Sequence, residues 1–166
     1  MIVERATGER FGAVLGERVL APLGPDATSY VTGATLPAPY SHAYVSSNDP
    51  DRALFRGSQR IDTSGVTLGI AAASAVVATA EDVARFYRAL LRGELLSPET
   101  VELMTRKGLG LAMYSTPCGL AYGHDGGLYG YVSYARVAAD GSKAAVLLAS
   151  GYQGTGFVDD LFCARP

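Results

Sequence analysis

Metal ligands are scarce in this sequence, which has only two histidines and two cysteines among its 166 residues. A metal site needs a cluster of such ligands at close spacing, and these four side chains do not form one along the chain. The signatures of a phosphate-binding loop, of a dinucleotide-binding turn and of a G-x-S-x-G nucleophile turn are absent as well. We therefore expect no metal, no cofactor and no active site of those classes.

Positive charge is also in short supply, because 14 lysines and arginines are outnumbered by 16 aspartates and glutamates. Nucleic acids and anionic membranes are bound through a basic face that displaces counterions, so neither is an expected partner. No apolar run approaches the roughly 20 residues that span a bilayer. Charges occur throughout residues 1–19, so this stretch is typical of a helical region and not of a signal sequence.

The sequence does have enough apolar residues to form a core. Its 48% hydrophobic content and its length of 166 residues fit one ordinary domain. Periodicity divides the chain into a mainly helical and loop region, 1–108, and a region of antiparallel strands with a terminal helix, 109–166. We therefore predict an α+β domain in which helices flank an antiparallel sheet.

The clearest helix signal begins at Thr79, because Thr-x-x-Asp resembles a capping box and a stripe of apolar residues follows as far as Gly93. Ser97, followed by a proline, predicts the start of another short helix. Two shorter helices are indicated within the first 24 residues. Residues 25–68 have no sustained period and predict long loops with short elements.

Strand signals replace helix signals after residue 108. Aromatic and β-branched residues are frequent in 108–114 and 129–137, and 143–150 is a short apolar run. The Asp-Gly pair at 140–141 predicts a tight hairpin turn between the last two stretches. Residues 157–163 predict a final helix that packs back on this antiparallel meander.

His124 lies among glycines at the start of a predicted strand. Successive side chains of a strand point to opposite faces, so His124 and Asp125 cannot easily act as a base and its orienting carboxylate. Gly126 and Gly127 leave the backbone bare, which allows a ligand to lie against the strand edge. Residue types alone favour a plainer interpretation, in which the glycines form a bulge and His124 is a polar group at the end of the sheet.

Four blocks of sequence occur in an order that is more specific than any one of them. They are TGERF with ERVLAPLG near the start, residues 73–104, Gly-Leu-Gly-Leu at 108–111, and residues 122–150. Together they resemble the C-terminal two thirds of the penicillin-recognising serine hydrolases, and within them the D-alanyl-D-alanine carboxypeptidases and class C beta-lactamases. The resemblance implies an incomplete beta-lactamase/transpeptidase-like fold and a small-molecule or peptidoglycan-like acyl substrate.

The resemblance also assigns roles to the histidine stretch. His124-Asp125-Gly126 is similar to the family's H-x-G motif on the edge strand of the active site. This implies that His124 and Gly127 are catalytic, the imidazole moving a proton or holding charge and the Gly127 N–H binding the oxyanion. It implies that Asp125 and Gly126 bind substrate.

Two further motifs of the family are missing. Neither lysine follows a serine by three residues, so S-x-x-K is absent, and the single asparagine, Asn48, does not follow a tyrosine by two, so Y-x-N is absent. In the family both motifs precede the block with which this sequence begins. We therefore expect a partial domain whose nucleophile, base and two strands lie upstream, and which is inactive alone. Asp125 replaces a hydroxyl residue that helps peptidases bind a terminal carboxylate, which makes an esterase or amidase a competing assignment.

The two cysteines, Cys118 and Cys163, stand at places where related extracytoplasmic peptidases form a disulfide. The resemblance therefore implies a Cys118–Cys163 disulfide and a secreted or extracytoplasmic parent protein. The alternative is a pair of buried thiols in a cytosolic chain, which the lack of a signal sequence favours.

Three functional hypotheses remain open at this stage. The chain is the larger part of a serine hydrolase domain, a non-catalytic remnant that at most binds a ligand along the Gly126 edge, or an interaction module. The first hypothesis predicts marginal stability or self-association, because a missing half leaves sheet surface exposed.

Overall fold

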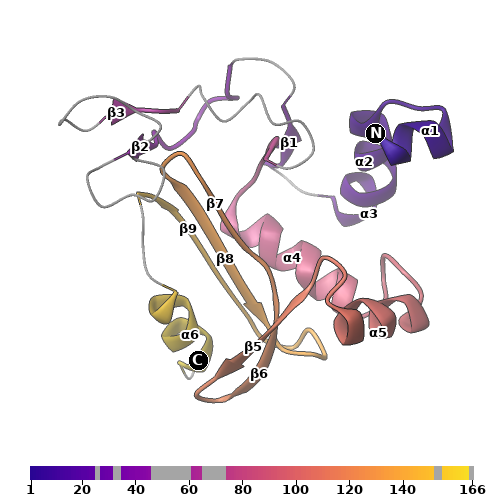
Figure 1. Ribbon diagram of the computed structural model, residues 1–166, viewed down its shortest axis with the longest axis vertical. Helices are drawn as coiled ribbons and strands as arrows, with labels where there is room; N and C mark the ends of the chain where they lie inside the picture. The colour runs from indigo at the N-terminus through magenta and orange to yellow at the C-terminus, as the bar shows by residue number, and fades with distance from the viewer. Residues whose placement is uncertain (25–26, 32–34, 46–60, 65–73, 152–154, 165–166) are drawn as a thin grey trace.

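The computed structural model describes residues 1–24, 27–31, 35–45, 61–64, 74–151 and 155–164. Its centre is an antiparallel sheet with a helix on each face, which confirms the predicted α+β class (Figure 1). The strands of this sheet are β5 (Ala112–Thr116), β6 (Gly119–Gly123), β7 (Asp125–Leu128), β8 (Tyr131–Val137) and β9 (Ala144–Ser150).

β8 is the central strand of the sheet. It pairs with β9 along its whole length on one side and with β6 and β7 on the other. Tyr122 of β6 pairs with Val137, and Asp125 of β7 pairs with Tyr134, so the two segments keep one register across the break at His124. β6 and β7 are therefore two parts of one bent strand.

Apolar side chains of opposite parity on β8 pack against different helices. Val132 and Tyr134 form a cluster with Val158 and Phe162 of α6 (Gly156–Cys163). Val137 belongs to a second cluster on the other face, with residues of α4 (Ala80–Leu91) and α5 (Pro98–Lys107). This arrangement gives three layers, with α6 and α4 on opposite sides of the sheet (Figure 1).

The predicted helix signals are confirmed. The Thr79 side chain accepts a hydrogen bond from the Asp82 N–H at 3.2 Å and caps α4, and the Ser97 side chain caps α5. Near the start lie α1 (Ile2–Thr7), α2 (Phe11–Leu15), a π-helical segment η1 (Gly16–Leu20) and α3 (Ala21–Leu23). Gly8 and Gly24 end α1 and α3 in the left-handed conformation that glycine tolerates best.

Two strand predictions need correction at their boundaries. The strand predicted over 129–137 starts at Tyr131, because Tyr129 and Gly130 have φ angles of 47° and 88° and form the turn between β7 and β8. The strand predicted over 108–114 starts at Ala112 and reaches Thr116. The hairpin turn at 140–141 and the terminal helix are confirmed.

The loop region contributes two short strand pairs within its described residues. β1 (Ser29–Tyr30) pairs with β4 (Val76–Val77), and β2 (Tyr44–Val45) pairs with β3 (Ile61–Asp62). The β2–β3 pair packs against the β7–β8 turn. Much of the predicted loop, including 46–60, lies outside the described residues.

Gly130 is the contact point between that turn and β2. A Cβ atom at Gly130 would lie 2.6 Å from the Tyr44 carbonyl oxygen, and the backbone has a φ of +88°. Gly130→Ala should therefore lower the free energy of unfolding by about 1–3 kcal/mol, measured by urea denaturation.

Gly16→Ala is the matched control for Gly130→Ala. Gly16 has a helical φ of −57°, and a Cβ there meets no atom within 4 Å. Alanine at this position should be neutral or stabilise by up to about 1 kcal/mol. Equal effects of the two substitutions would contradict this account of Gly130.

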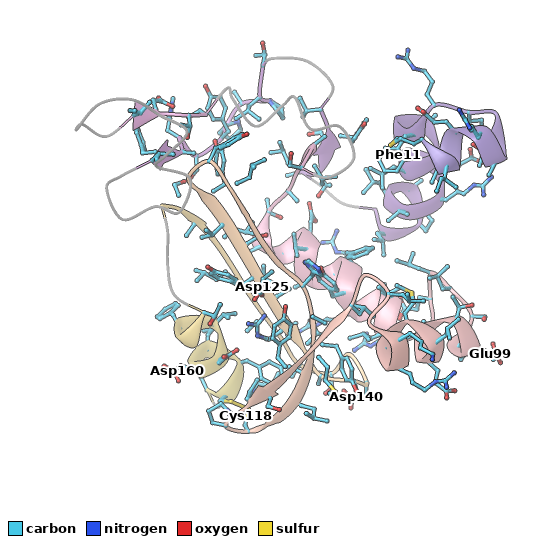
Figure 2. All side chains as sticks on the ribbon, in the orientation of Figure 1. Phe11, Glu99, Cys118, Asp125, Asp140 and Asp160 are labelled. Carbon is cyan, nitrogen blue, oxygen red and sulfur yellow. A yellow bond between two sulfur atoms is a disulfide. The ribbon has the colours of Figure 1, made fainter. Side chains whose placement is uncertain are left out.

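The structure joins Cys118 and Cys163 in a disulfide, at a sequence separation of 45. The bond links the β5–β6 turn to the end of α6 (Figure 2). Closing a loop of this length stabilises a fold by about 4 kcal/mol on the chain-entropy estimate. The double variant Cys118→Ser, Cys163→Ser should therefore unfold at a clearly lower urea concentration, and thiol counting of the denatured unreduced protein should find no free thiol. Two titratable thiols would contradict the disulfide.

Candidate active site

The candidate site lies where the edge of the main sheet becomes uncovered. β5 pairs with the outer edge of β6, and its last pair is Ala112 with Gly123. Among the strands that the structure describes, β7 pairs only with β8. From His124 onward, no described strand therefore pairs with the outer edge of the sheet, which we call the open edge.

Hydrogen bonding to β8 determines which backbone groups face the open edge. The His124 carbonyl accepts from the Ala135 N–H at 3.2 Å, so the polar backbone groups of His124 face β8. In an antiparallel pair these groups alternate between facing inward and outward along a strand. Asp125 and Gly127 consequently direct their N–H and C=O groups outward. The Gly127 N–H is positioned to donate to a ligand, as its predicted oxyanion role requires.

The His124 ring is exposed and is held against its own strand. Its Nδ1 lies 2.6 Å from the Asp125 carbonyl oxygen. A carbonyl oxygen can only accept, so Nδ1 carries the proton in this contact. In the neutral imidazole, Nε2 is then the acceptor, which leaves a basic nitrogen free for a ligand.

Asp125 occupies the opposite face of the sheet from His124, as strand alternation predicted. Its carboxylate pairs with Arg136 of β8, with Oδ1 2.6 Å from Nη1, whereas His124 and Gly126 line a groove on the other face. The Asp125 carboxylate is therefore paired with Arg136 and is not part of the lining of this groove.

Sequence reasoning missed Arg136. Its side chain is almost fully buried, and its Nε donates to Asp159 of α6 at 2.8 Å, while its guanidinium lies 3.4 Å from the centre of the Tyr114 ring. Burial disfavours the charge, but the bonds to Asp125 and Asp159 outweigh it and raise the pKa of Arg136. The sequence did contain a signal for its position. On strand β8, Arg136 has the same parity as Val132 and Tyr134, so its side chain lies on the face that α6 covers.

The groove in front of the sheet has a volume of about 840 Å³. α4 lines one side with Val83, Phe86 and Tyr87, and the first helices line another with Leu15, Val19, Leu20 and Leu23. Among its described lining residues, Asp82 is the only aspartate, glutamate, lysine or arginine. Burial, followed by the proximity of Tyr114 and Asp125, raises the pKa of Tyr87 to about 12, so its hydroxyl stays protonated at neutral pH.

The second histidine forms a separate cluster with Asp62 and Ser64. His42 Nδ1 lies 3.1 Å from Asp62 Oδ2 and 3.2 Å from Ser64 Oγ. A catalytic triad needs the serine and the carboxylate on different ring nitrogens, so this cluster cannot relay a proton from serine to aspartate through the ring. Its hydrogen bonds instead connect β2 to the end of β3.

The described residues contain no group of three or more His, Cys, Asp or Glu side chains that could hold a metal ion. No helix within the described ranges has both the length and the apolar character needed to cross a bilayer.

Comparison with known proteins identifies the family. The family model for Beta-lactamase matches residues 1–162, so the chain belongs to the Beta-lactamase family. A D-stereospecific amidohydrolase from Streptomyces sp. is similar in structure, with a TM-score of 0.78 and 29% identity over 90% of this chain and 46% of that one.

Two further solved structures share the fold. A D-amino acid amidase from Ochrobactrum anthropi SV3, complexed with L-phenylalanine amide, has a TM-score of 0.74 and 21% identity over 96% of this chain and 51% of its own. A penicillin binding protein from Bacillus halodurans has a TM-score of 0.72 and 20% identity over the same shares. The present chain therefore spans about half the length of the proteins it matches.

The two glycines of β7 should respond differently to a methyl group. A Cβ atom at Gly126 would lie 2.5 Å from Ser133 Oγ, whereas one at Gly127 would meet nothing closer than 3.9 Å. Gly126→Ala should lower the free energy of unfolding by about 1 kcal/mol, because Ser133 must move. Gly127→Ala should change it by less than about 0.5 kcal/mol.

Adding Ser133→Gly to the Gly126→Ala variant separates the contact from other effects. If the contact with Ser133 Oγ is the cause, the double variant should lose much less stability than the sum of the losses of the two single variants. Additive losses in urea denaturation would mean that the Gly126 position is constrained by something other than Ser133.

Proposed function

We propose that this chain forms the edge-strand wall of a serine-type amidohydrolase site that acts on amides of D-amino acids. One observation carries the proposal. At the open edge of β7, the outward Gly127 N–H lies on the same short strand segment as His124, whose Nε2 has no hydrogen bond to another described residue. Both face a region where an extended substrate can align with β7.

Each group has a defined task in this proposal. The Gly127 N–H stabilises the oxyanion that develops when the amide carbonyl is attacked, an interaction worth about 3–4 kcal/mol when one such donor is removed from other hydrolases. His124 Nε2 accepts and returns a proton near the leaving group. The Nδ1 contact with Asp125 holds the ring in one tautomer, so that Nε2 faces the ligand.

The charge distribution supports an amide substrate over a peptide with a free carboxylate. The Asp125 carboxylate is paired on the far face, and the described lining of the groove includes no lysine or arginine to bind a terminal carboxylate. Similarity to the Streptomyces amidohydrolase, at 29% identity, points in the same direction. Carboxypeptidase activity is therefore the less favoured assignment within this family.

The nucleophile comes, in this proposal, from a segment outside these 166 residues. The sequence contains neither S-x-x-K nor Y-x-N, and it spans about half of the similar structures. The edge strand β7 and His124 offer an oxyanion donor and a proton-transfer group, but they include no serine to form the acyl-enzyme of a serine hydrolase. The Cys118–Cys163 disulfide supports a parent protein that resides outside the cytoplasm, where such bonds persist.

Self-association through exposed sheet is a second candidate function. Among the described strands, β9 pairs only with β8, and Leu148 and Val76 beside the groove are 38% and 48% exposed. Open strand edges and exposed apolar side chains favour association between chains. Light scattering over a concentration series tests this, and a monomer at all concentrations would argue against it.

The catalytic proposal is tested in the protein that carries these residues together with an S-x-x-K segment. His124→Ala should lower kcat/KM for D-phenylalanine amide by roughly 10²–10⁴-fold, because the proton-transfer group is lost. His42→Ala is the matched control and should leave the rate within about twofold, since its ring takes part in a separate structural cluster. Equal rates for both variants would exclude His124 from catalysis.

A labelling experiment on the 166-residue chain tests the origin of the nucleophile. A fluorescent penicillin or an acyl-phosphonate probe should leave this chain unlabelled. Covalent labelling of one of its serines, located by mass spectrometry, would show that the nucleophile lies within the chain.

A further inference from the structure

Arg136 is a buried arginine placed directly behind the candidate site. It is 1% exposed, and it bonds two carboxylates from different elements, Asp125 of β7 and Asp159 of α6. The bond to Asp125 uses both terminal nitrogens, at 2.6 and 3.4 Å. The Tyr114 ring covers the guanidinium at 3.4 Å, so β5 contributes a third side to the cluster.

The position of Asp125 gives this cluster a connection to the site. Asp125 stands between His124, whose ring lies beside the open edge, and Gly126, which lines the groove. β7 has four residues, and within the described part of the chain only β8 pairs with it. A short strand with one paired edge opens readily unless side-chain contacts hold it.

We propose that Arg136 is a positioning residue for the site: it holds Asp125 on the α6 face and thereby fixes the backbone of His124–Gly127 along the open edge. This inference rests on the proposed function, which makes the open edge of β7 the edge that binds substrate. With Asp125 held on the α6 face, its carboxylate pairs with Arg136 and does not line the groove.

α6 is the second anchor of this clamp. Asp159 fixes the guanidinium from the helix, and the disulfide at Cys163 ties the end of the same helix to the β5–β6 turn. Lys143 adds a bond from its Nζ to the Ala164 carbonyl at 3.0 Å. The position of β7 therefore depends on a helix that does not itself line the groove.

Amide hydrogen exchange measured by NMR on the 166-residue chain tests the clamp without requiring catalysis. In Asp125→Ala, Arg136 keeps Asp159 as a partner, but β7 loses its tether. The inward-facing amides of Gly126 and Leu128 should then exchange at least tenfold faster, while the amides of β9 that pair with β8 change less than threefold. The Arg136→Met variant should give the same pattern if it folds. If that variant does not fold, the result for Asp125→Ala still decides the test.

The matched control is Asp160→Asn, which removes a carboxylate from the solvent-exposed side of α6 (Figure 2). It should leave all of these exchange rates unchanged. Equal acceleration of β7 and β9 amides in Asp125→Ala would mean that the cluster only stabilises the fold, and unchanged β7 amides would mean that it does not hold the strand. Either result overturns the proposal.

A titration with D-phenylalanine amide separates this inference from the proposed function. If wild-type resonances of His124 and Gly127 shift on titration, Asp125→Ala should weaken the binding at least tenfold, because the ligand-facing groups are no longer held in place. If the wild-type chain shows no shifts, amide binding by this chain fails, and the exchange rates still decide whether Arg136 positions β7.

Discussion

The shared register of β6 and β7 on β8 is the constraint from which the candidate site follows. Because one antiparallel register runs across His124, parity alone assigns the His124 ring to the groove and Asp125 to the far face. The same register directs the Gly127 N–H outward. The pairing of β5 extends along this edge only as far as Gly123, one residue before these groups begin. A slip of one residue would exchange the two faces and place a carboxylate in the groove.

The same register places an acidic residue, Asp125, in β7, and the buried Arg136 compensates its charge. An unpaired carboxylate or guanidinium at this depth would cost several kcal/mol, whereas two carboxylates and an aromatic face satisfy the guanidinium together. Such a cluster is weak support for stability, because apolar residues of similar volume often serve equally well. The cluster instead restricts the position of Asp125, because the planar guanidinium of Arg136 can donate to a carboxylate in only a few orientations.

Short sequence patterns predicted those features of the fold that depend on residues close together in the chain. The Thr79 cap, the Asp140-Gly141 turn and the alternation of His124 and Asp125 each depend on neighbouring residues, and the structure has all three. Contacts across the fold could not be predicted in this way. The Asp159 carboxylate meets Arg136 only because α6 packs on β8, and the turn at Tyr129 was missed because a tyrosine with a positive φ angle is rare. The family resemblance carried the catalytic assignments, which no local signal contained.

The size and lining of the groove indicate which part of it can determine specificity. Its volume of about 840 Å³ lies in the range that holds a drug-sized molecule and is far larger than an amino acid amide needs. α2, η1, α3 and α4 contribute mainly apolar side chains to its wall, and the strands and loops contribute the rest. On the proposed function, a small amide is oriented at the rim formed by β7, by the Gly127 N–H and His124 Nε2. In the same proposal, discrimination between amide and carboxylate is made at residues 124–127, in a groove whose described lining contains no lysine or arginine.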